Sequence, residues 1–366
     1  MAVELGVVSL QVRGFRNLTA VDLKPGPRFN VISGDNGQGK TSLLEALYVL
    51  CTSRSFRIEK LTEVIQAGNA VAVVSGQLKE AGVVRRQRAS VARDERQFVI
   101  DDKPQARLSD YATRTPVVVF QPGDLQLISG SAAGRRKLLD RVSLFLNPLS
   151  MDHRQRFASA QRERQRLLDT RGSGARELDA YERVMAKHGT ELERMRLLAA
   201  EKLQHAATSA FERLGDPRVK VALRFAPGGP YEEEQLRLQL YQGRSDDQRR
   251  KSTRIGPHKD DLEIELDHRL ARRHASQGQQ RMLALALKLA ELECLCHARG
   301  AFPLLLLDDV SSELDHSRTN AVYDFLKQSQ SQVFLTTTRP ELFSFAPSSS
   351  TERCDFRLEQ GALRDG

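Results

Sequence analysis

A glycine-rich loop near the amino terminus constrains the fold of this chain more than any other feature. Residues 34–41 read Gly-Asp-Asn-Gly-Gln-Gly-Lys-Thr and match the pattern G-x-x-x-x-G-K-S/T without a gap. An apolar run, 29–33, precedes the loop, and leucines at a helical spacing follow it over 42–50. This order predicts a strand, a loop whose N–H groups face a phosphate, and a helix that begins at the phosphate. We therefore expect an α/β fold.

The residues of this loop have expected roles in holding a nucleotide. Lys40 would neutralise the β- and γ-phosphates of ATP, and the Thr41 hydroxyl would coordinate Mg²⁺. The glycines let the backbone curl so that its N–H groups face the phosphates. We predict that the nucleotide is bound by Gly34, Asp35, Asn36, Gly37, Gln38, Gly39, Lys40, Thr41 and Ser42.

A second motif is an apolar strand that ends in two carboxylates, at 302–309. Its four consecutive leucines suit a strand that is buried on both faces of a parallel sheet. Asp308 would emerge beside the phosphate loop and hold Mg²⁺, and Asp309 would orient and deprotonate the attacking water. Two aspartates after a strand can also simply begin a helix. The complete phosphate loop favours the metal interpretation.

The remaining sequence divides into regions of different composition. Strand and helix patterns occupy the two ends of the chain, whereas 135–214 is rich in Arg, Glu, Leu, Ala and Gln and predicts long helices. A break at 170–174 splits this region into at least two helices, which we expect to pair antiparallel. We predict one nucleotide-binding domain, made of residues 1–134 and 253–366, with a helical insertion domain, 135–252, between its halves.

A serine and glycine segment before a strong helix narrows the class of fold. Ser276-Gln277-Gly278-Gln279-Gln280 precedes an apolar helix, and that helix precedes the acidic strand. A hydroxyl, a glycine and a helix N-terminus together make an anion site. The segment and its order resemble the signature motif of ABC-type ATPase heads, which implies a contact in trans to the nucleotide of a second copy. A serine N-cap on an amphipathic helix fits the same residues equally well.

Shorter segments agree with the ABC class. Ser312-Glu313-Leu314-Asp315 resembles a D-loop, which contacts the opposite head. Gln121 follows a predicted strand, 117–120, where a Q-loop glutamine would couple the γ-phosphate and Mg²⁺ to the helical insertion, although a lone glutamine after a strand is commonplace. Where a transporter would carry a histidine, Thr336 to Thr338 stand instead, so that a switch contact would use a hydroxyl.

Four segments together resemble the RecF family, SMC-like ABC ATPase heads without a long coiled coil. They are Gly14 to Leu18, Thr253 to Asp261, Ser276 to Arg281 and Leu307 to Asp315, and the chain length also agrees. The resemblance implies an ATP-dependent homodimer, binding to DNA, both duplex and single-strand/duplex junctions, and weak DNA-stimulated ATP hydrolysis. It further implies cooperation with RecR and RecO in loading RecA at gapped DNA during repair.

The resemblance also bears on residues outside the motifs. Arg16 would reach the nucleotide, as N-terminal residues do in related heads, although a solvated strand edge is a competing interpretation. The expected catalytic set is Asp309, Lys40 and Gln121, with an aspartate where transporters usually have glutamate. His258, Asp260 and Asp261 have no further metal-ligand spacing, and their role is left open.

Basic residues indicate where DNA would bind. The net charge of +9 suits a polyanionic partner, although many proteins are mildly basic without one. Arginines of the insertion are candidate contacts to the DNA backbone, with a solvated helix face as the alternative. Because Trp is absent and the other aromatic residues are scattered, we predict no base stacking or base readout. The candidates are Arg154, Arg156, Arg162 and Arg164.

Membrane contact is not expected. We find no signal peptide and no apolar run near the ~20 residues that a membrane helix needs, so we expect a cytoplasmic, nucleoid-associated protein. Two alternatives stay open. One is the ATPase subunit of a membrane transporter, which should carry a histidine switch, and the other is an ATP-binding DNA clamp with negligible hydrolysis.

Overall fold

The computed structural model describes residues 2–105, 107–214, 219–309, 330–340 and 352–364. The chain forms two compact units, Met1–Asp124 with Leu295–Gly366, and Leu125–Cys294. The boundary between the units falls inside one helix, α10 (Gln277–Arg299). Within the described ranges, no helix is both long and apolar enough to span a bilayer.

A mostly parallel sheet in the first unit positions the phosphate loop. Its strand order is β15-β14-β3-β13-β12-β8, and only β15 runs antiparallel to its neighbour. Strands β3, β13, β12 and β8 are mostly apolar and buried, as strands covered on both faces must be. The strands are β3 (Phe29–Ser33), β8 (Val117–Phe120), β12 (Leu304–Asp308), β13 (Val333–Thr337), β14 (Arg353–Glu359) and β15 (Ala362–Arg364).

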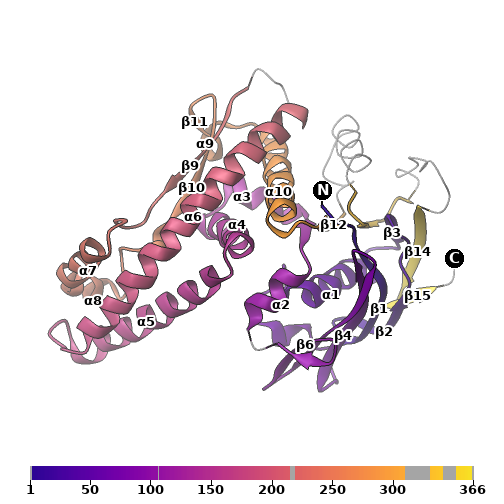
Figure 1. The fold of residues 1–366 in the computed structure, drawn as a ribbon, viewed down its shortest axis with the longest axis horizontal. Helices are drawn as coiled ribbons and strands as arrows, with labels where there is room; N and C mark the ends of the chain where they lie inside the picture. The colour runs from indigo at the N-terminus through magenta and orange to yellow at the C-terminus, as the bar shows by residue number, and fades with distance from the viewer. Residues whose placement is uncertain (1, 106, 215–218, 310–329, 341–351, 365–366) are drawn as a thin grey trace. The chain divides into compact units, whose positions relative to one another are not determined.

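An antiparallel sheet forms the other layer of this unit, and helix α1 (Lys40–Thr52) contacts strands of both sheets (Figure 1). One buried apolar cluster joins side chains of α1 with side chains of the two sheets, which fixes the direction of the helix. The strand order is β2-β1-β4-β5-β6-β7. The strands are β1 (Leu5–Phe15), β2 (Leu18–Leu23), β4 (Val71–Glu80), β5 (Val83–Ala92), β6 (Arg96–Ile100) and β7 (Lys103–Pro104), accompanied by η1 (Leu61–Val64), α2 (Leu108–Arg114) and η2 (Pro122–Leu125).

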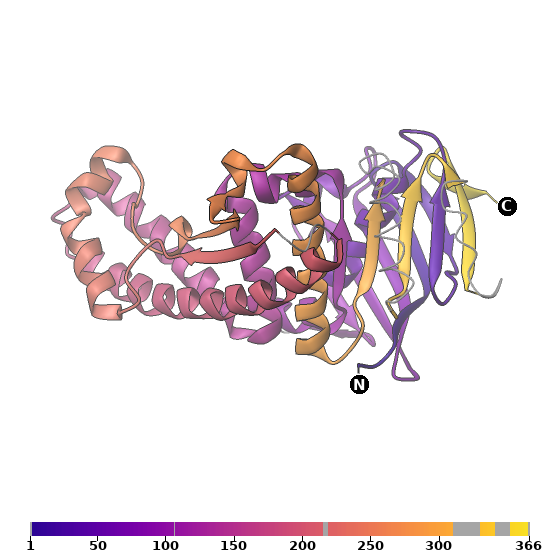
Figure 2. The ribbon, with the colours of Figure 1, turned by 90° about the horizontal axis from the view of Figure 1, so that it is seen from above.

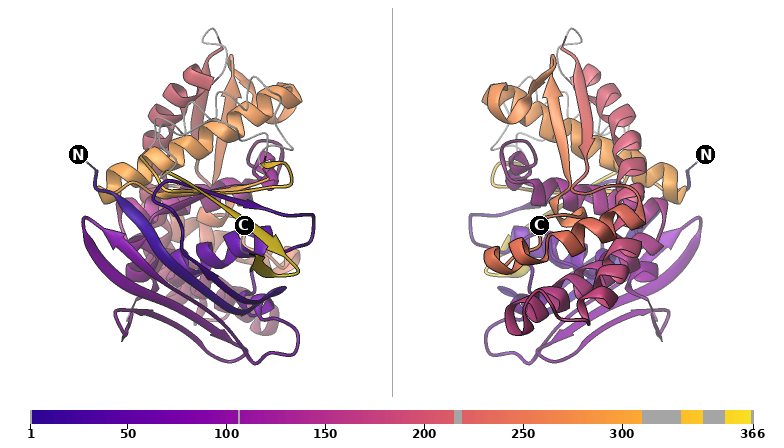
Figure 3. Two further views of the ribbon diagram at one scale, coloured as in Figure 1. Left: turned by 90° about the vertical axis from the view of Figure 1, so that its right-hand side faces the viewer. Right: turned by 90° about the vertical axis from the view of Figure 1, so that its left-hand side faces the viewer.

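Helices dominate the second unit. Helices α5 (Leu149–Arg171) and α6 (Leu178–Leu214) form the expected pair, and Gly172 ends α5 with a φ of 82°. A small antiparallel sheet, β11-β10-β9, packs beside α6 and α4 (Figures 2 and 3). The other elements are α3 (Gln126–Ser129), α4 (Ala132–Leu146), β9 (Val221–Ala226), α7 (Glu233–Gln242), α8 (Arg244–Arg250), η3 (Pro257–Lys259), β10 (Asp261–Leu266), β11 (Arg269–Leu270) and α9 (Ala271–His274).

The compact units differ from the predicted sequence boundaries. Residues 253–294 fall with the helical unit and not with the first unit. The physical reason is strand pairing, because β10 is hydrogen-bonded to β9 along its whole length, from Asp261↔Ala226 to Leu266↔Val221. A ladder of this kind cannot be divided between two compact bodies. A predicted strand such as 117–120, by contrast, is reproduced residue for residue.

Candidate nucleotide-binding site

The phosphate loop connects β3 to α1 and is tightly braced by the chain around it. Lys40 Nζ donates to the carbonyl oxygens of Gly34 at 2.6 Å and Asp35 at 2.8 Å. Gly39 caps α1 with a φ of 107°, where a Cβ would lie 2.7 Å from Leu18 Cδ2. A Cβ on Gly34 would lie 2.4 Å from a backbone oxygen, that of Leu358. Both positions therefore require glycine.

An open pocket of about 510 Å³ lies over this loop. The pocket brings together most of the predicted nucleotide-binding and metal-binding residues and adds three residues from outside that predicted set. The predicted lining residues are Arg16, Asn36, Gly37, Gly39, Lys40, Thr41, Ser42, Asp308 and Asp309, and the additional ones are Asn17, Arg57 and Thr336.

Four predicted residues do not line the pocket. Gly34 and Asp35 support Lys40 from behind, through the carbonyl oxygens described above. Gln38 ties the loop to the C-terminal hairpin, since its carbonyl oxygen accepts from the backbone N–H of Gly361 at 3.1 Å. Gln121 follows β8 directly, and the parallel register of β8 with β12 places it beside Asp308 at the strand ends. Its side chain is not among the lining groups.

Two threonines converge on the carboxylate at the end of β12. Thr41 Oγ1 and Thr336 Oγ1 each donate to Asp308 Oδ1 at 2.8 Å. Burial raises the pKa of Asp308, and these two hydrogen bonds oppose the increase. The buried carboxylate would therefore gain from a nearby cation. The sequence predicts Thr41 and Asp308 as Mg²⁺ ligands, and it predicts Thr336 only as a possible hydroxyl contact.

The donor set fits Mg²⁺. A hydroxyl oxygen of Thr41 and a carboxylate oxygen of Asp308 are hard ligands, which this ion prefers. The described residues contain no cluster of three or more His, Cys, Asp or Glu side chains that could hold a metal by themselves. That agrees with Mg²⁺, which commonly takes one or two protein ligands and completes its shell with water and phosphate oxygens.

Asp309 lies next to this pair and close to the charge of Lys40. Its backbone has a φ of 49°, and its N–H donates to Thr336 Oγ1 at 3.1 Å. Burial lowers the pKa of Lys40, and the charges of Asp309 and Asp308 oppose that decrease. An ammonium group flanked by two carboxylates at the mouth of a loop can bind an anion together with a divalent cation.

The segment predicted to act in trans forms a helix cap. The Ser276 N–H donates to Gln279 Oε1 at 2.8 Å, and the Gln279 N–H donates to Ser276 Oγ at 3.2 Å. This reciprocal capping box is the structural alternative expected from the sequence. Ser276, Gln277 and Gln279 are exposed, so the beginning of α10 is open to a partner. The predicted D-loop residues Ser312, Glu313, Leu314 and Asp315 lie outside the described residues.

The arginines proposed to contact DNA differ in their surroundings. Arg156 is paired with Asp152 at 3.0 Å, and Arg154 lies 3.7 Å from Asp140. Arg162 is exposed and has no ion-pair partner among the residues that the structure describes.

The prediction that Arg164 contacts DNA is wrong. Its side chain is 0% exposed, and its guanidinium donates to Glu182 at 2.9 Å, to Asp247 at 2.7 Å and to the carbonyl oxygen of Leu240 at 2.7 Å. Arg164 therefore joins α5 to α6, α7 and α8. Its charge is compensated inside the protein, and the side chain is not available to a polyanion.

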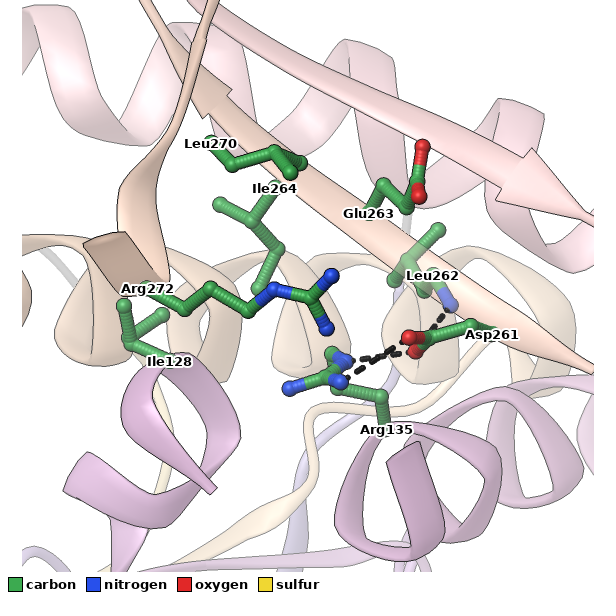
Figure 4. A pocket seen from close by; sticks show the side chains of 8 residues that line it. All are labelled: Ile128, Arg135, Asp261, Leu262, Glu263, Ile264, Leu270 and Arg272. Carbon is green, nitrogen blue, oxygen red and sulfur yellow. Dashed lines mark hydrogen bonds and ion pairs between the residues drawn. The ribbon is translucent and has the colours of Figure 1, made fainter. Parts of the chain in front are cut away.

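The structure assigns a packing role to the segment that contains His258, Asp260 and Asp261. Arg135 donates to both carboxylate oxygens of Asp261, at 2.6 and 3.0 Å (Figure 4). Burial alone would raise the pKa of Asp261, but the hydrogen bonds and charge of Arg135 lower it. The cavity beside this pair, which Arg272 also lines, has a volume of about 10 Å³. That is room for about one water molecule, so this ion pair holds α4 against β10 and does not form a ligand site.

The preceding residues of this segment are also held in place. His258 Nε2 lies 2.7 Å from the carbonyl oxygen of Thr253, and burial lowers the pKa of His258 to about 4. Asp260 is fully buried, where it accepts from Arg196 Nη1 at 2.8 Å and from the Gly228 N–H at 2.7 Å. A neutral imidazole and a compensated carboxylate anchor the loop to α6, and no metal is needed to explain them.

Known proteins resemble this chain along nearly its whole length. The model of the RecF/RecN/SMC N-terminal domain matches residues 6–354. The chain is 39% identical to the DNA replication and repair protein RecF of Anaeromyxobacter sp. (strain Fw109-5), over 98% of each chain. It is 38% identical to the protein of the same name from Myxococcus xanthus (strain DK1622), over 98% of this chain and 97% of that one.

Solved structures agree with these matches. A structure of the recombination mediator protein RecF with ATP superposes with a TM-score of 0.88 at 27% identity, covering 100% of this chain and 98% of that chain. The Smc head domain of Pyrococcus furiosus, crystallised with the C-terminal domain of ScpA, gives a TM-score of 0.57 at 18% identity over 98% of this chain and 95% of that one. The second likeness shows a shared ATPase-head fold.

Proposed function

This chain belongs to the RecF family of DNA replication and repair proteins, and on that premise we propose that it binds ATP between two copies of itself and grips DNA in the closed form. The observation that carries this proposal is the meeting of Thr41 and Asp308. Their side chains are 267 positions apart in the sequence, yet Thr41 Oγ1 lies 2.8 Å from Asp308 Oδ1 in the pocket that contains Lys40. A phosphate loop and an acidic strand in this arrangement suit a Mg-nucleotide.

The residues around the nucleotide pocket have distinct roles in the proposed ATP hydrolysis. The loop N–H groups and Lys40 bind the β- and γ-phosphates, and Thr41 with Asp308 hold Mg²⁺. Bound Mg²⁺ would supply positive charge that offsets the negative charge of the phosphates. Asp309 orients a water and accepts its proton as the water oxygen attacks the γ-phosphorus, while the bond from the γ-phosphorus to the β–γ bridging oxygen breaks and ADP leaves with that oxygen. Gln121, directly after β8, would couple the presence of the γ-phosphate to the helical unit.

The dimer rests on the exposed start of α10. Ser276 and Gly278 present a hydroxyl, N–H groups and the positive end of a 23-residue helix, which suit the γ-phosphate held by a second copy. Ser276 Oγ already accepts one N–H of its own helix and retains capacity for a further hydrogen bond. With Gln277, Gln279 and Gln280, this segment is the proposed contact in trans.

The proposed partners follow from the family. They are duplex DNA and single-strand/duplex junctions, with RecR, RecO and RecA acting at gapped DNA. The surplus of basic residues supports contact with the DNA backbone, and Arg162 is the best placed of the original candidates because it is exposed and free of an ion pair in the described part of the chain.

Two experiments separate this function from its alternatives. ATP turnover should rise when duplex DNA is added, and Asp309→Asn should abolish turnover while ATP-dependent dimerisation persists. The matched control is Asp94→Asn, the same change at an exposed turn of the same unit. Negligible turnover with DNA present would favour a DNA clamp that binds ATP, and persistent turnover in Asp309→Asn would remove Asp309 from the proposed role.

A further inference from the structure

A buried carboxylate lies beside the nucleotide pocket and has no part in the proposed hydrolysis. Glu45 belongs to α1, five residues after Lys40, and its side chain is 0% exposed. A buried carboxylate is strongly unfavourable unless charged partners and hydrogen bonds compensate it. The partners of Glu45 therefore indicate its functional role.

Two arginines from different segments share this carboxylate. Arg16, in the turn between β1 and β2, donates through Nε to Oε2 at 3.1 Å and through Nη2 to Oε1 at 2.9 Å. Arg57, beyond the end of α1, approaches Oε2 through Nη1 at 3.3 Å. Ser55 Oγ donates to Oε1 at 2.5 Å. The carboxylate of Glu45 is therefore fully occupied and cannot act as a base.

The local backbone is shaped to bring these partners in. Helix α1 ends at Thr52 and is capped by Ser53, whose φ of 61° turns the chain back toward the helix. Ser55 Oγ then accepts from the backbone N–H groups of Arg57 at 2.9 Å and Ile58 at 3.1 Å, which fixes the turn that carries Arg57. On the other side, Arg16 has a φ of 55° and donates through Nη1 to the carbonyl oxygen of Glu63 at 3.1 Å.

Both arginines also line the nucleotide pocket, whereas Glu45 does not. The side chains of Arg16 and Arg57 are 20% and 42% exposed. Two guanidinium groups around one carboxylate leave a net positive charge facing the pocket. Each guanidinium has donors beyond those that Glu45 uses, and a planar fork held in place is well suited to phosphate oxygens.

We infer that Glu45 is a positioning residue, which holds Arg16 and Arg57 as a fixed pair of cations over the phosphates of the bound nucleotide. This inference rests on the proposed function, because it names further phosphate contacts of the same site. Flexible arginines lose side-chain entropy when they order on a ligand, and an arginine that is already fixed avoids most of that loss. Glu45 thus acts on the nucleotide only through its two partners.

A double-mutant cycle with Mg-ATP as the probe tests this inference. Glu45→Gln should weaken Mg-ATP binding about tenfold or more, because charge-assisted hydrogen bonds hold the two cations. In the background of Arg16→Gln with Arg57→Gln, the same Glu45→Gln change should have no further effect on affinity. A residue that only stabilised the core would give the same loss in both backgrounds. Glu63→Gln, an exposed site whose backbone oxygen still receives Arg16, is the matched control and should bind as the native protein does.

The outcomes are separable. Equal losses in both backgrounds, or no loss in Glu45→Gln while the native protein binds Mg-ATP, overturn the positioning role and leave the proposed function standing. Failure of the native protein to bind Mg-ATP overturns both. Far-UV circular dichroism confirms folding, and if Glu45→Gln does not fold, Glu45→Asp takes its place with the same expectation, since it retracts the carboxylate from both arginines.

Discussion

Replacing Glu193 by glutamine should make the protein more stable at alkaline pH and leave it unchanged near pH 5. Glu193 lies on α6, is 0% exposed, and packs against the carboxylate of Asp260. Burial raises the pKa of Glu193 to about 8, and the nearby charge of Asp260 adds to the increase. In the folded protein at neutral pH, Glu193 is therefore a neutral acid beside the charge of Asp260.

The sign and size of the effect follow from linkage between protonation and folding. In the unfolded chain Glu193 has an ordinary pKa of 4.5, so the unfolded state releases a proton that the folded state keeps. The contribution of Glu193 to the free energy of unfolding is complete below pH 4.5 and is lost as pH rises to about 8. At about 1.4 kcal/mol for each pH unit, the total loss is of the order of 5 kcal/mol. A glutamine amide is neutral at every pH and so avoids this loss.

Urea unfolding at pH 5, 7 and 9, followed by far-UV circular dichroism, measures the difference directly. Glu193→Gln should match the native protein at pH 5 and exceed it by several kcal/mol at pH 9. Glu201→Gln, at an exposed position of the same helix, should follow the native protein at every pH. Parallel stability curves for Glu193→Gln and the native protein, or a less stable variant at pH 9, would refute the argument that Glu193 is buried as a neutral acid.

Three further predictions concern other parts of the molecule. Arg164→Met should lower the free energy of unfolding by roughly 3–5 kcal/mol because it strands buried carboxylates, whereas Arg162→Ala, on an exposed face, should change it by less than about 0.5 kcal/mol in the same urea titration. Gly34→Ala should abolish ATP binding in calorimetry, since its Cβ would meet the backbone oxygen of Leu358 at 2.4 Å; native-like affinity would contradict the bracing of the loop. Ser276→Arg should block ATP-induced dimerisation in light scattering but leave ATP binding by the single head largely intact, and loss of binding would refute the assignment in trans.

Local sequence patterns were sufficient for the parts of the site that each segment builds alone. The phosphate loop can be predicted from the sequence because its glycines, Lys40 and Thr41 occur in one uninterrupted run between a strand and a helix. The strand 304–308 can be predicted in the same way, because four leucines followed by an aspartate suit few environments other than a buried parallel sheet. The expectation that the two motifs meet follows from the strand as well, because Asp308 emerges at its C-terminal end, beside the phosphate loop.

Residues that depend on distant partners could not be assigned in this way. Arg164 and Arg162 look alike in an arginine-rich helix, but Arg164 is buried against residues distant in the sequence, among them Asp247, 83 positions away. Asp261 is explained by Arg135, 126 positions away. Glu45 and Arg57 carry no motif, since their relation to the pocket depends on the turn after α1. Residue spacing predicts which side chains share one face of a single helix or strand, whereas these contacts form only when distant elements pack together.

The central claim is that ATP joins two copies of this chain into a unit that holds DNA. Multi-angle light scattering of the native protein with Mg-ATP and a short duplex, beside Lys40→Ala under the same conditions, tests it most directly. The account predicts that the native protein elutes as two chains with bound duplex, whereas Lys40→Ala elutes as one chain without it. Pairing and duplex binding by Lys40→Ala at native levels would contradict the account.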